Sequence, residues 1–66
     1  MREMSPAAKE ACAALKTLGV LYERHRRPET RAQIKELALA VTRRFGSRHG
    51  AVIISEAVIE VLEADI

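Results

Sequence analysis

The sequence predicts an all-α fold, in which a single small domain over residues 1–66 contains three helices and a short extended connector before the last helix. Three observations support this prediction. Residues 30–45 repeat apolar side chains at the helical period, Ser5 and Pro6 form a typical helix start, and Ser55 precedes a short stretch with helical spacing. The expected helices span residues 6–26, 30–46 and 55–64.

The first predicted helix is rich in alanine and begins at a clear capping signal. Ser5 can cap the helix, and proline is tolerated at the first helical position, which Pro6 would occupy. One face is small and apolar, so a neighbouring helix can approach it closely; its members are Ala8, Ala11, Cys12, Leu15, Leu18, Gly19 and Tyr22. Gly19 has two open interpretations. It marks a close contact, or it kinks or ends the helix, since glycine costs up to about 1 kcal/mol in a helix interior.

The central helix, residues 30–46, carries the strongest periodic signal in the chain. Pro28 biases Arg27 toward an extended conformation and so separates this helix from the first. Thr30 is predicted to cap the helix, and Gln33 to complete a capping box. The apolar stripe lies within about 60° of Ile34 on the helix surface. Its other members are Leu37, Ala38, Val41 and Phe45.

The last third of the chain predicts a break, a connector and a short helix. Gly46 or Gly50 can form a left-handed C-terminal cap. Residues 51–54 are expected to be extended, and Ser55 is expected to cap the final helix. Ile54 and Ile59 would then form a hydrophobic staple. The predicted core comprises Leu15, Leu18, Tyr22, Ile34, Leu37, Ala38, Val41, Phe45, Ile54, Val58, Val61 and Leu62.

The formal charge of +2 hides a strong asymmetry along the chain. Residues 1–50 carry all eleven lysines and arginines with five of the nine acidic residues, which gives +6. Residues 51–66 carry the remaining four acidic residues, which gives −4. One interpretation is that the basic part attracts nucleic acid. The other, which we favour, is that the acidic last helix folds against the basic central helix.

No residue pattern in the chain specifies a reaction, a metal or a cofactor. Cys12 lies in the middle of a helix among alanines, where buried packing is the better interpretation than a reactive thiol. His25 and His49 have no neighbours in the sequence that would complete a metal site. The glycines of residues 46–50 lack the spacing and the preceding strand of a phosphate-binding loop. We therefore expect neither an enzyme nor a bound cofactor.

Arginines gather around both ends of the central helix and form a candidate basic patch. Its members are Arg24, Arg26, Arg27, Arg31, Arg43, Arg44 and Arg48. Such clusters contact phosphates in nucleic-acid-binding proteins, but they also suit the C-terminal ends of helices. The segment 46–54 is too long for the turn of a helix-turn-helix. A small basic nucleic-acid-binding protein is the alternative function.

The last forty residues resemble a known family. The pattern combines an Arg-led helix containing Ile-Lys-Glu-x-Ala, a glycine-containing turn, an isoleucine, a Ser-Glu cap and a short helix with valine. Its residues here are Arg31, Ile34, Lys35, Glu36, Ala38, Gly50, Ile54, Ser55, Glu56, Ala57 and Val58. It is similar to the small C-terminal helical domain of the light-independent protochlorophyllide reductase B subunit, the PCP-reductase-like domain. The resemblance implies an accessory module beside a redox or metalloenzyme complex, and it carries no catalytic residue across.

We predict a non-enzymatic helical interaction module. A chain of 66 residues buries little core, and with one cysteine it has no internal disulfide, so self-association or a protein partner would add stability. Val20, Leu21 and Leu39 lie off the main apolar stripes and are the candidate partner-facing residues. A cysteine-poor chain without a secretory signal fits the cytoplasm. No apolar run reaches the roughly 20 residues that span a bilayer.

Overall fold

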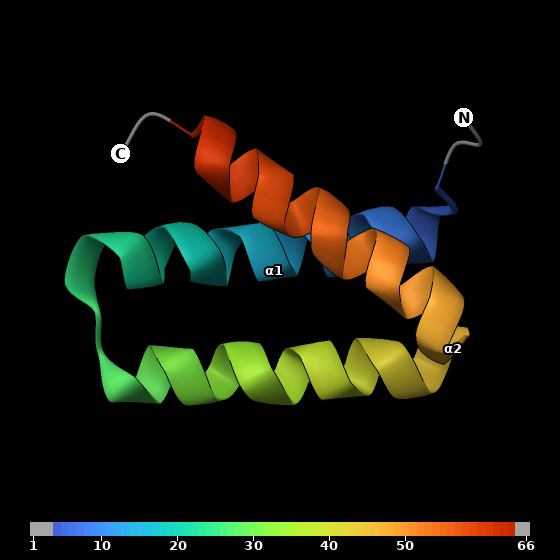
Figure 1. Ribbon diagram of the computed structural model, residues 1–66, viewed down its shortest axis with the longest axis horizontal. Helices are drawn as coiled ribbons and strands as arrows, with labels where there is room; N and C mark the ends of the chain where they lie inside the picture. Colours follow the sequence, from blue (N-terminus) through green and yellow to red (C-terminus); the bar gives the residue numbers. More distant parts are fainter. Residues whose placement is uncertain (1–3, 65–66) are drawn as a thin grey trace.

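The computed structural model describes residues 4–64 and shows two helices, α1 (Pro6–His25) and α2 (Pro28–Glu63). The all-α class is therefore confirmed, but the prediction of three helices is wrong. Helix α2 is bent sharply at Gly46, whose φ of 86° and ψ of 163° are not helical. We call residues 28–45 the first arm of α2 and residues 47–63 its second arm. The first arm runs antiparallel to α1, and the second arm turns back across it (Figure 1).

Helix α1 follows the sequence prediction to within one residue. The Ser5 hydroxyl accepts a hydrogen bond from the Ala8 backbone N–H at 3.2 Å, and Pro6 begins the helix. The helix ends at His25, and Arg26 adopts the left-handed conformation, with φ 51° and ψ 37°. The Arg26 N–H donates to the Tyr22 carbonyl at 2.7 Å, which closes the last turn.

Gly19 neither ends nor kinks α1, because the helix continues through it. A Cβ atom placed on Gly19 would lie 2.6 Å from Cγ2 of Val61 in the second arm. Of the two interpretations left open by the sequence, close contact is the one that the structure supports. The small residue lets the second arm approach α1.

Helix α2 begins two residues earlier than predicted, so the proposed Thr30–Gln33 capping box is wrong. Arg27 is the N-cap residue, with an extended backbone at φ −81° and ψ 136°, and no side chain forms a capping hydrogen bond. Pro28 occupies the start of the helix, where its missing N–H is not needed and its fixed φ is already helical. Thr30 is instead buried, with 6% of its surface exposed.

The predicted connector and final cap are also corrected. Residues 51–54 are helical, and Ser55 lies inside the second arm, so no cap and no staple form there. The physical reason is that Gly46 alone reverses the chain, because glycine adopts positive φ without the clash of a Cβ atom. Gly50 is buried and helical, and a Cβ atom there would lie 2.9 Å from the Thr42 Cα. Its small size lets the two arms of α2 pass close to each other.

A thin core lies where α1 meets both arms of α2. The buried apolar residues are Ala8, Cys12, Leu15, Val41, Ile53 and Ala57. Half-buried residues surround them, namely Met4, Ala11, Leu37, Ala38, Phe45 and Ile54. None of the large side chains in residues 4–64 is completely buried. The predicted core is wrong at Val58 and Leu62, which are 51% and 78% exposed, because Ile53 and Ala57 occupy the inward face of the second arm.

Candidate protein-interaction surface

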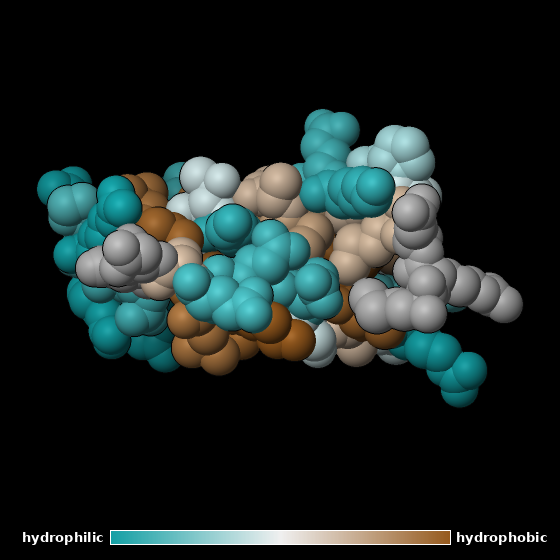
Figure 2. All heavy atoms as spheres, turned by 90° about the horizontal axis from the view of Figure 1, so that it is seen from above, coloured by the Kyte–Doolittle hydropathy of each residue, from teal (hydrophilic) through white to brown (hydrophobic). Residues whose placement is uncertain are grey.

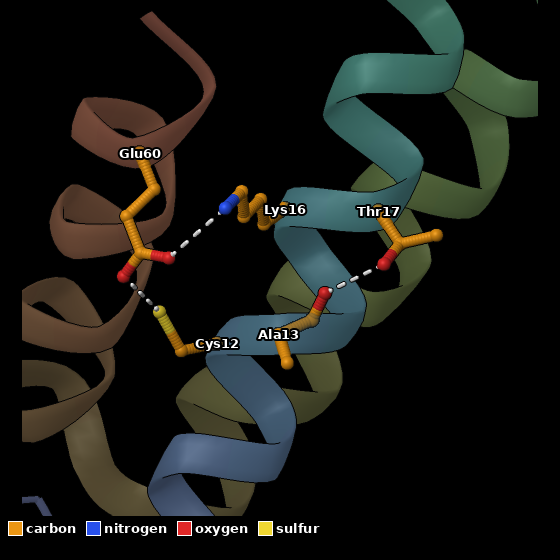
Figure 3. A network of polar contacts seen from close by, with 5 residues as sticks. All are labelled: Cys12, Ala13, Lys16, Thr17 and Glu60. Carbon is orange, nitrogen blue, oxygen red and sulfur yellow. Dashed lines mark hydrogen bonds and ion pairs between the residues drawn. The ribbon is translucent and has the colours of Figure 1, made fainter. Parts of the chain in front are cut away.

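A polar network joins α1 to the second arm around the single cysteine (Figure 3). The Cys12 thiol donates to Glu60 Oε2 at 3.6 Å, and Lys16 Nζ lies 3.8 Å from Glu60 Oε1. Burial, followed by the negative charge of Glu60, raises the pKa of Cys12 above its ordinary value of 9.0. A thiol that is held protonated is a poor nucleophile, so this group fits a packing role. Thr17 donates to the Ala13 carbonyl at 3.0 Å within α1.

Ligands for a metal ion do not gather in the described part of the chain. Among residues 4–64, no three His, Cys, Asp or Glu side chains lie close enough to share an ion. His25 and His49 are both exposed, and they lie near opposite ends of the first arm.

The structure divides the candidate basic patch into two groups. Arg24, Arg26, Arg27 and Arg31 surround the turn between α1 and α2, whereas Arg43, Arg44 and Arg48 surround the bend at Gly46; all seven are exposed. Arg31 and Arg43 are twelve positions apart on the helix, which is about 18 Å at 1.5 Å per residue. Arg26 also pairs with Glu23 at 3.1 Å and lies over the Tyr22 ring. The arginines therefore do not form one continuous edge.

The three residues predicted to face a partner are likewise not brought together. Val20 is half-buried and Leu21 is 42% exposed, and both line a shallow hollow beside Lys16 and Arg24 of α1. Leu39 is 48% exposed and lies on the first arm, opposite its core-facing stripe. A single exposed leucine is common on protein surfaces and by itself indicates no site.

The largest set of exposed apolar side chains lies on the second arm, and sequence reasoning missed it. We call these four residues the apolar ridge: Val52, Val58, Ile59 and Leu62, with exposures of 51%, 51%, 48% and 78%. At 100° per residue, they fall within an arc of about 120°. A signal was present in the sequence, since the segment AVIISEAVIEVL places apolar residues on nearly all sides of a helix. Such a helix is normally covered on more than one face.

An apolar groove of about 260 Å³ runs beside the ridge. Helix α1 lines it with Leu15, Gly19, Tyr22 and, as its one charged residue, Glu23, which pairs with Arg26. The first arm forms one wall with Ile34 and Ala38. The second arm forms the other wall through Ile54, Val58, Val61 and Leu62. Val58 and Leu62 thus belong to both features, so the ridge and the groove form one continuous apolar surface.

Opposite charges border this surface. Glu56 and Glu63 follow Val52 around the second arm, and we call them the acidic edge. Beyond the groove, Arg31 and Lys35 lie next to Ile34 and Ala38 on the first arm and line a neighbouring hollow with Tyr22; we call them the basic edge. Seen from above, a hydrophilic band borders hydrophobic side chains that reach the surface (Figure 2). The helix positions and the lining of the groove give the order across the molecule as acidic edge, ridge, groove, basic edge.

Neither helix, over the residues that the structure describes, is long and apolar enough to cross a membrane. No protein family, no curated protein and no solved structure matches this chain.

Proposed function

We propose that this chain is a non-enzymatic helical module that works by binding another polypeptide. The apolar ridge of the second arm is the observation that supports this proposal. Four large aliphatic side chains lie on one face of one helical segment, and each is about half exposed or more. Several exposed apolar side chains on one helix face, bordered by polar residues, are typical of interaction sites in soluble proteins. The adjoining groove would receive apolar side chains of the bound partner.

The free energy gained by covering the ridge is large for a molecule of this size. At about 2 kcal/mol for each fully buried aliphatic side chain, covering the exposed parts of the four ridge residues would contribute roughly 4–5 kcal/mol. Folded domains are stable by only about 5–15 kcal/mol in total. A partner on the ridge would therefore change the stability of this thin core substantially.

The resemblance to the PCP-reductase-like domain supports a narrower form of the proposal. An accessory module beside a redox or metalloenzyme complex would need a docking surface and no catalytic group of its own. The ridge and the groove meet that requirement. We also propose a cytoplasmic location, because one cysteine cannot form an internal disulfide and the reducing cytosol suits a free thiol.

The test compares two exposed leucines of α2 in the native host. A tagged chain is recovered with its bound polypeptides, and the mass of each intact complex is measured for the unchanged chain, Leu62→Ser and Leu39→Ser. We expect a defined polypeptide to be recovered with the unchanged chain and with Leu39→Ser, and to be lost with Leu62→Ser. Recovery that is equal for all three chains would overturn the proposal.

The same preparation also tests the nucleic-acid alternative. Binding to duplex DNA is measured at low and moderate salt for the unchanged chain and for Arg31→Gln with Arg43→Gln. Phosphate contacts made by both basic groups would give a steep salt dependence that falls in the double variant. If DNA binding shows that dependence and no polypeptide is recovered, the interaction-module proposal fails.

A further inference from the structure

We propose that the polypeptide bound on the ridge is a second copy of this chain, in a two-fold symmetric dimer. In this dimer the apolar ridge of each copy lies in the apolar groove of the other, and the two second arms run parallel. This inference rests on the proposed function, because it assigns a partner to the same surface. It commits to one occupant and one relative orientation.

Shape is the first argument. One chain carries both an exposed apolar helix face and an apolar groove beside it, and Val58 and Leu62 belong to both. A two-fold interface requires one surface patch to be complementary to itself. A patch that contains a ridge and a groove side by side meets this requirement when the symmetry axis runs between them. Each ridge then faces the groove of the other copy.

Charge is the second argument, and it selects the orientation. An axis that runs along the second arms places the acidic edge of each copy opposite the basic edge of the other. An axis perpendicular to the arms would place acidic edge against acidic edge, and like charges in contact are unfavourable. Glu56 and Glu63 in one copy would thus face Arg31 and Lys35 in the other. This arrangement makes the second arms parallel.

These edge charges are available because folding does not neutralise them. Over residues 4–64, the ion pairs within one copy are Lys16–Glu60 and Arg26–Glu23. Neither pair joins the acidic edge to the basic edge. The sequence led us to expect that the acidic segment folds against the basic central helix. The ion pair that it forms is instead with α1, between Glu60 and Lys16. The charges of the two edges therefore remain available to a partner.

The first experiment measures mass against concentration for the purified chain alone, by sedimentation equilibrium. We expect a monomer–dimer equilibrium for the unchanged chain and for Leu39→Ser. Leu62→Ser should raise the dissociation constant about tenfold or more, because each dimer loses two apolar contacts. Leu62 is 78% exposed in one copy, so its replacement leaves the monomer folded, as circular dichroism will verify.

The second experiment tests orientation by cysteine cross-linking in a Cys12→Ala background. Ala51 and Leu62 lie on the groove side of the second arm, eleven residues and about 16 Å apart along the helix. In a parallel dimer, Ala51→Cys and Leu62→Cys each lie near their own equivalents, so both single variants should form disulfide-linked dimers. In an antiparallel dimer, no more than one of the two can do so. Leu39→Cys is the control that should form no disulfide-linked dimer under the same oxidation.

The outcomes separate this inference from the proposed function. A chain that stays monomeric at all concentrations overturns the inference, as does a dimer that Leu62→Ser leaves unchanged or one that cross-links at only one of the two positions. If the purified chain is monomeric but a different polypeptide is recovered from the host in a Leu62-dependent manner, the proposed function survives without the dimer. If both results are negative, the proposed function fails too.

Discussion

At the scale of single residues, three glycines determine how the helical segments pack against one another. Gly46 supplies a backbone conformation, whereas Gly19 and Gly50 supply space. The distinction is physical: at Gly46 a Cβ atom would meet nothing within 4 Å, so only its torsion angles exclude other residues. At Gly19 the backbone is helical, so only the neighbouring Val61 excludes them.

The backbone role of Gly46 predicts a result that depends on handedness. Gly46→Ala should destabilise the fold by about 1–3 kcal/mol, because φ near +86° is strained for an L residue. D-alanine at the same position favours positive φ and should be tolerated. Chemical synthesis of both forms, followed by urea unfolding, checks this. Equal loss of stability with both alanines would show that space, and not conformation, decides this position.

The spatial role of Gly19 predicts a coupling with Val61. Gly19→Ala should destabilise the fold although alanine favours helix by up to about 1 kcal/mol, because the new methyl group would clash with a stiff β-branched side chain. In a Val61→Ala background the same substitution should become neutral or stabilising. A double-mutant cycle of unfolding free energies measures the coupling. Additive effects would contradict a direct contact between the two positions.

Cys12 predicts a loss of stability at alkaline pH. Its folded-state pKa is raised above the ordinary value of 9.0, so above that pH the unfolded chain releases the thiol proton while the folded chain retains it. The contribution of the protonated Cys12 thiol to the free energy of unfolding is complete below pH 9.0 and is lost as the pH rises through the folded-state pKa. Urea unfolding between pH 7 and 10.5 should show a steeper decline for the unchanged chain than for Cys12→Ala. Parallel declines would exclude this thiol as the cause.

At the scale of elements, the sequence predicted both ends of α1 to within one residue, whereas the local capping signals at Thr30 and Ser55 were misleading. Ser5 and Pro6 set the start of α1 through a hydrogen bond and a fixed φ, and both effects are local. The end of the first arm was predicted to within one residue, but the sequence left open whether Gly46 or Gly50 ends it. Gly46 and Gly50 are both good helix terminators, and only tertiary packing makes one a bend and the other a contact. A single-residue reversal removed the need for the connector at residues 51–54.

The candidate surface was predicted only in kind. An unpaired apolar surface was expected, but it was assigned to Val20, Leu21 and Leu39. The second arm is apolar on several sides, so its periodicity does not specify which side faces α1. Because the helix begins before Ser55 and packs through Ile53 and Ala57, Val58 and Leu62 turn outward. That rotation depends on contacts between residues distant in the sequence.

The end of α1 offers a further prediction. Arg26 holds a left-handed conformation that costs an ordinary residue about 1–2 kcal/mol and suits glycine. Its exposed ion pair with Glu23 and its contact with the Tyr22 ring each contribute less than that amount, at about 0.2–1 kcal/mol. Arg26→Gly should therefore stabilise the chain by up to about 1 kcal/mol in thermal unfolding. Glu23→Gln is the control that removes the ion pair alone, and it should change little.

At the scale of the whole molecule, residues 4–64 bury few apolar side chains. Association with a second copy should therefore raise the stability of the fold measurably. If the ridge is covered in a dimer, the melting temperature rises with protein concentration, because dissociation accompanies unfolding. Calorimetry over a hundredfold range of concentration should show this rise for the unchanged chain and for Leu39→Ser. The melting temperature of Leu62→Ser should vary much less. A concentration-independent melt of the unchanged chain would contradict dimerisation.

The two connections in the molecule differ in what they join. Helix α1 and the first arm are neighbours in the sequence, with only Arg26 and Arg27 between them. Their contacts can therefore form early in folding. The second arm reaches α1 only by returning over the hairpin, so its contacts through Ile53, Ala57 and Val61 join residues that are distant in the sequence. Of the three segments it should therefore detach most readily, which amide hydrogen exchange would register as the fastest opening. A polypeptide that binds the outer face of the second arm would thus also stabilise the packing of this arm on α1.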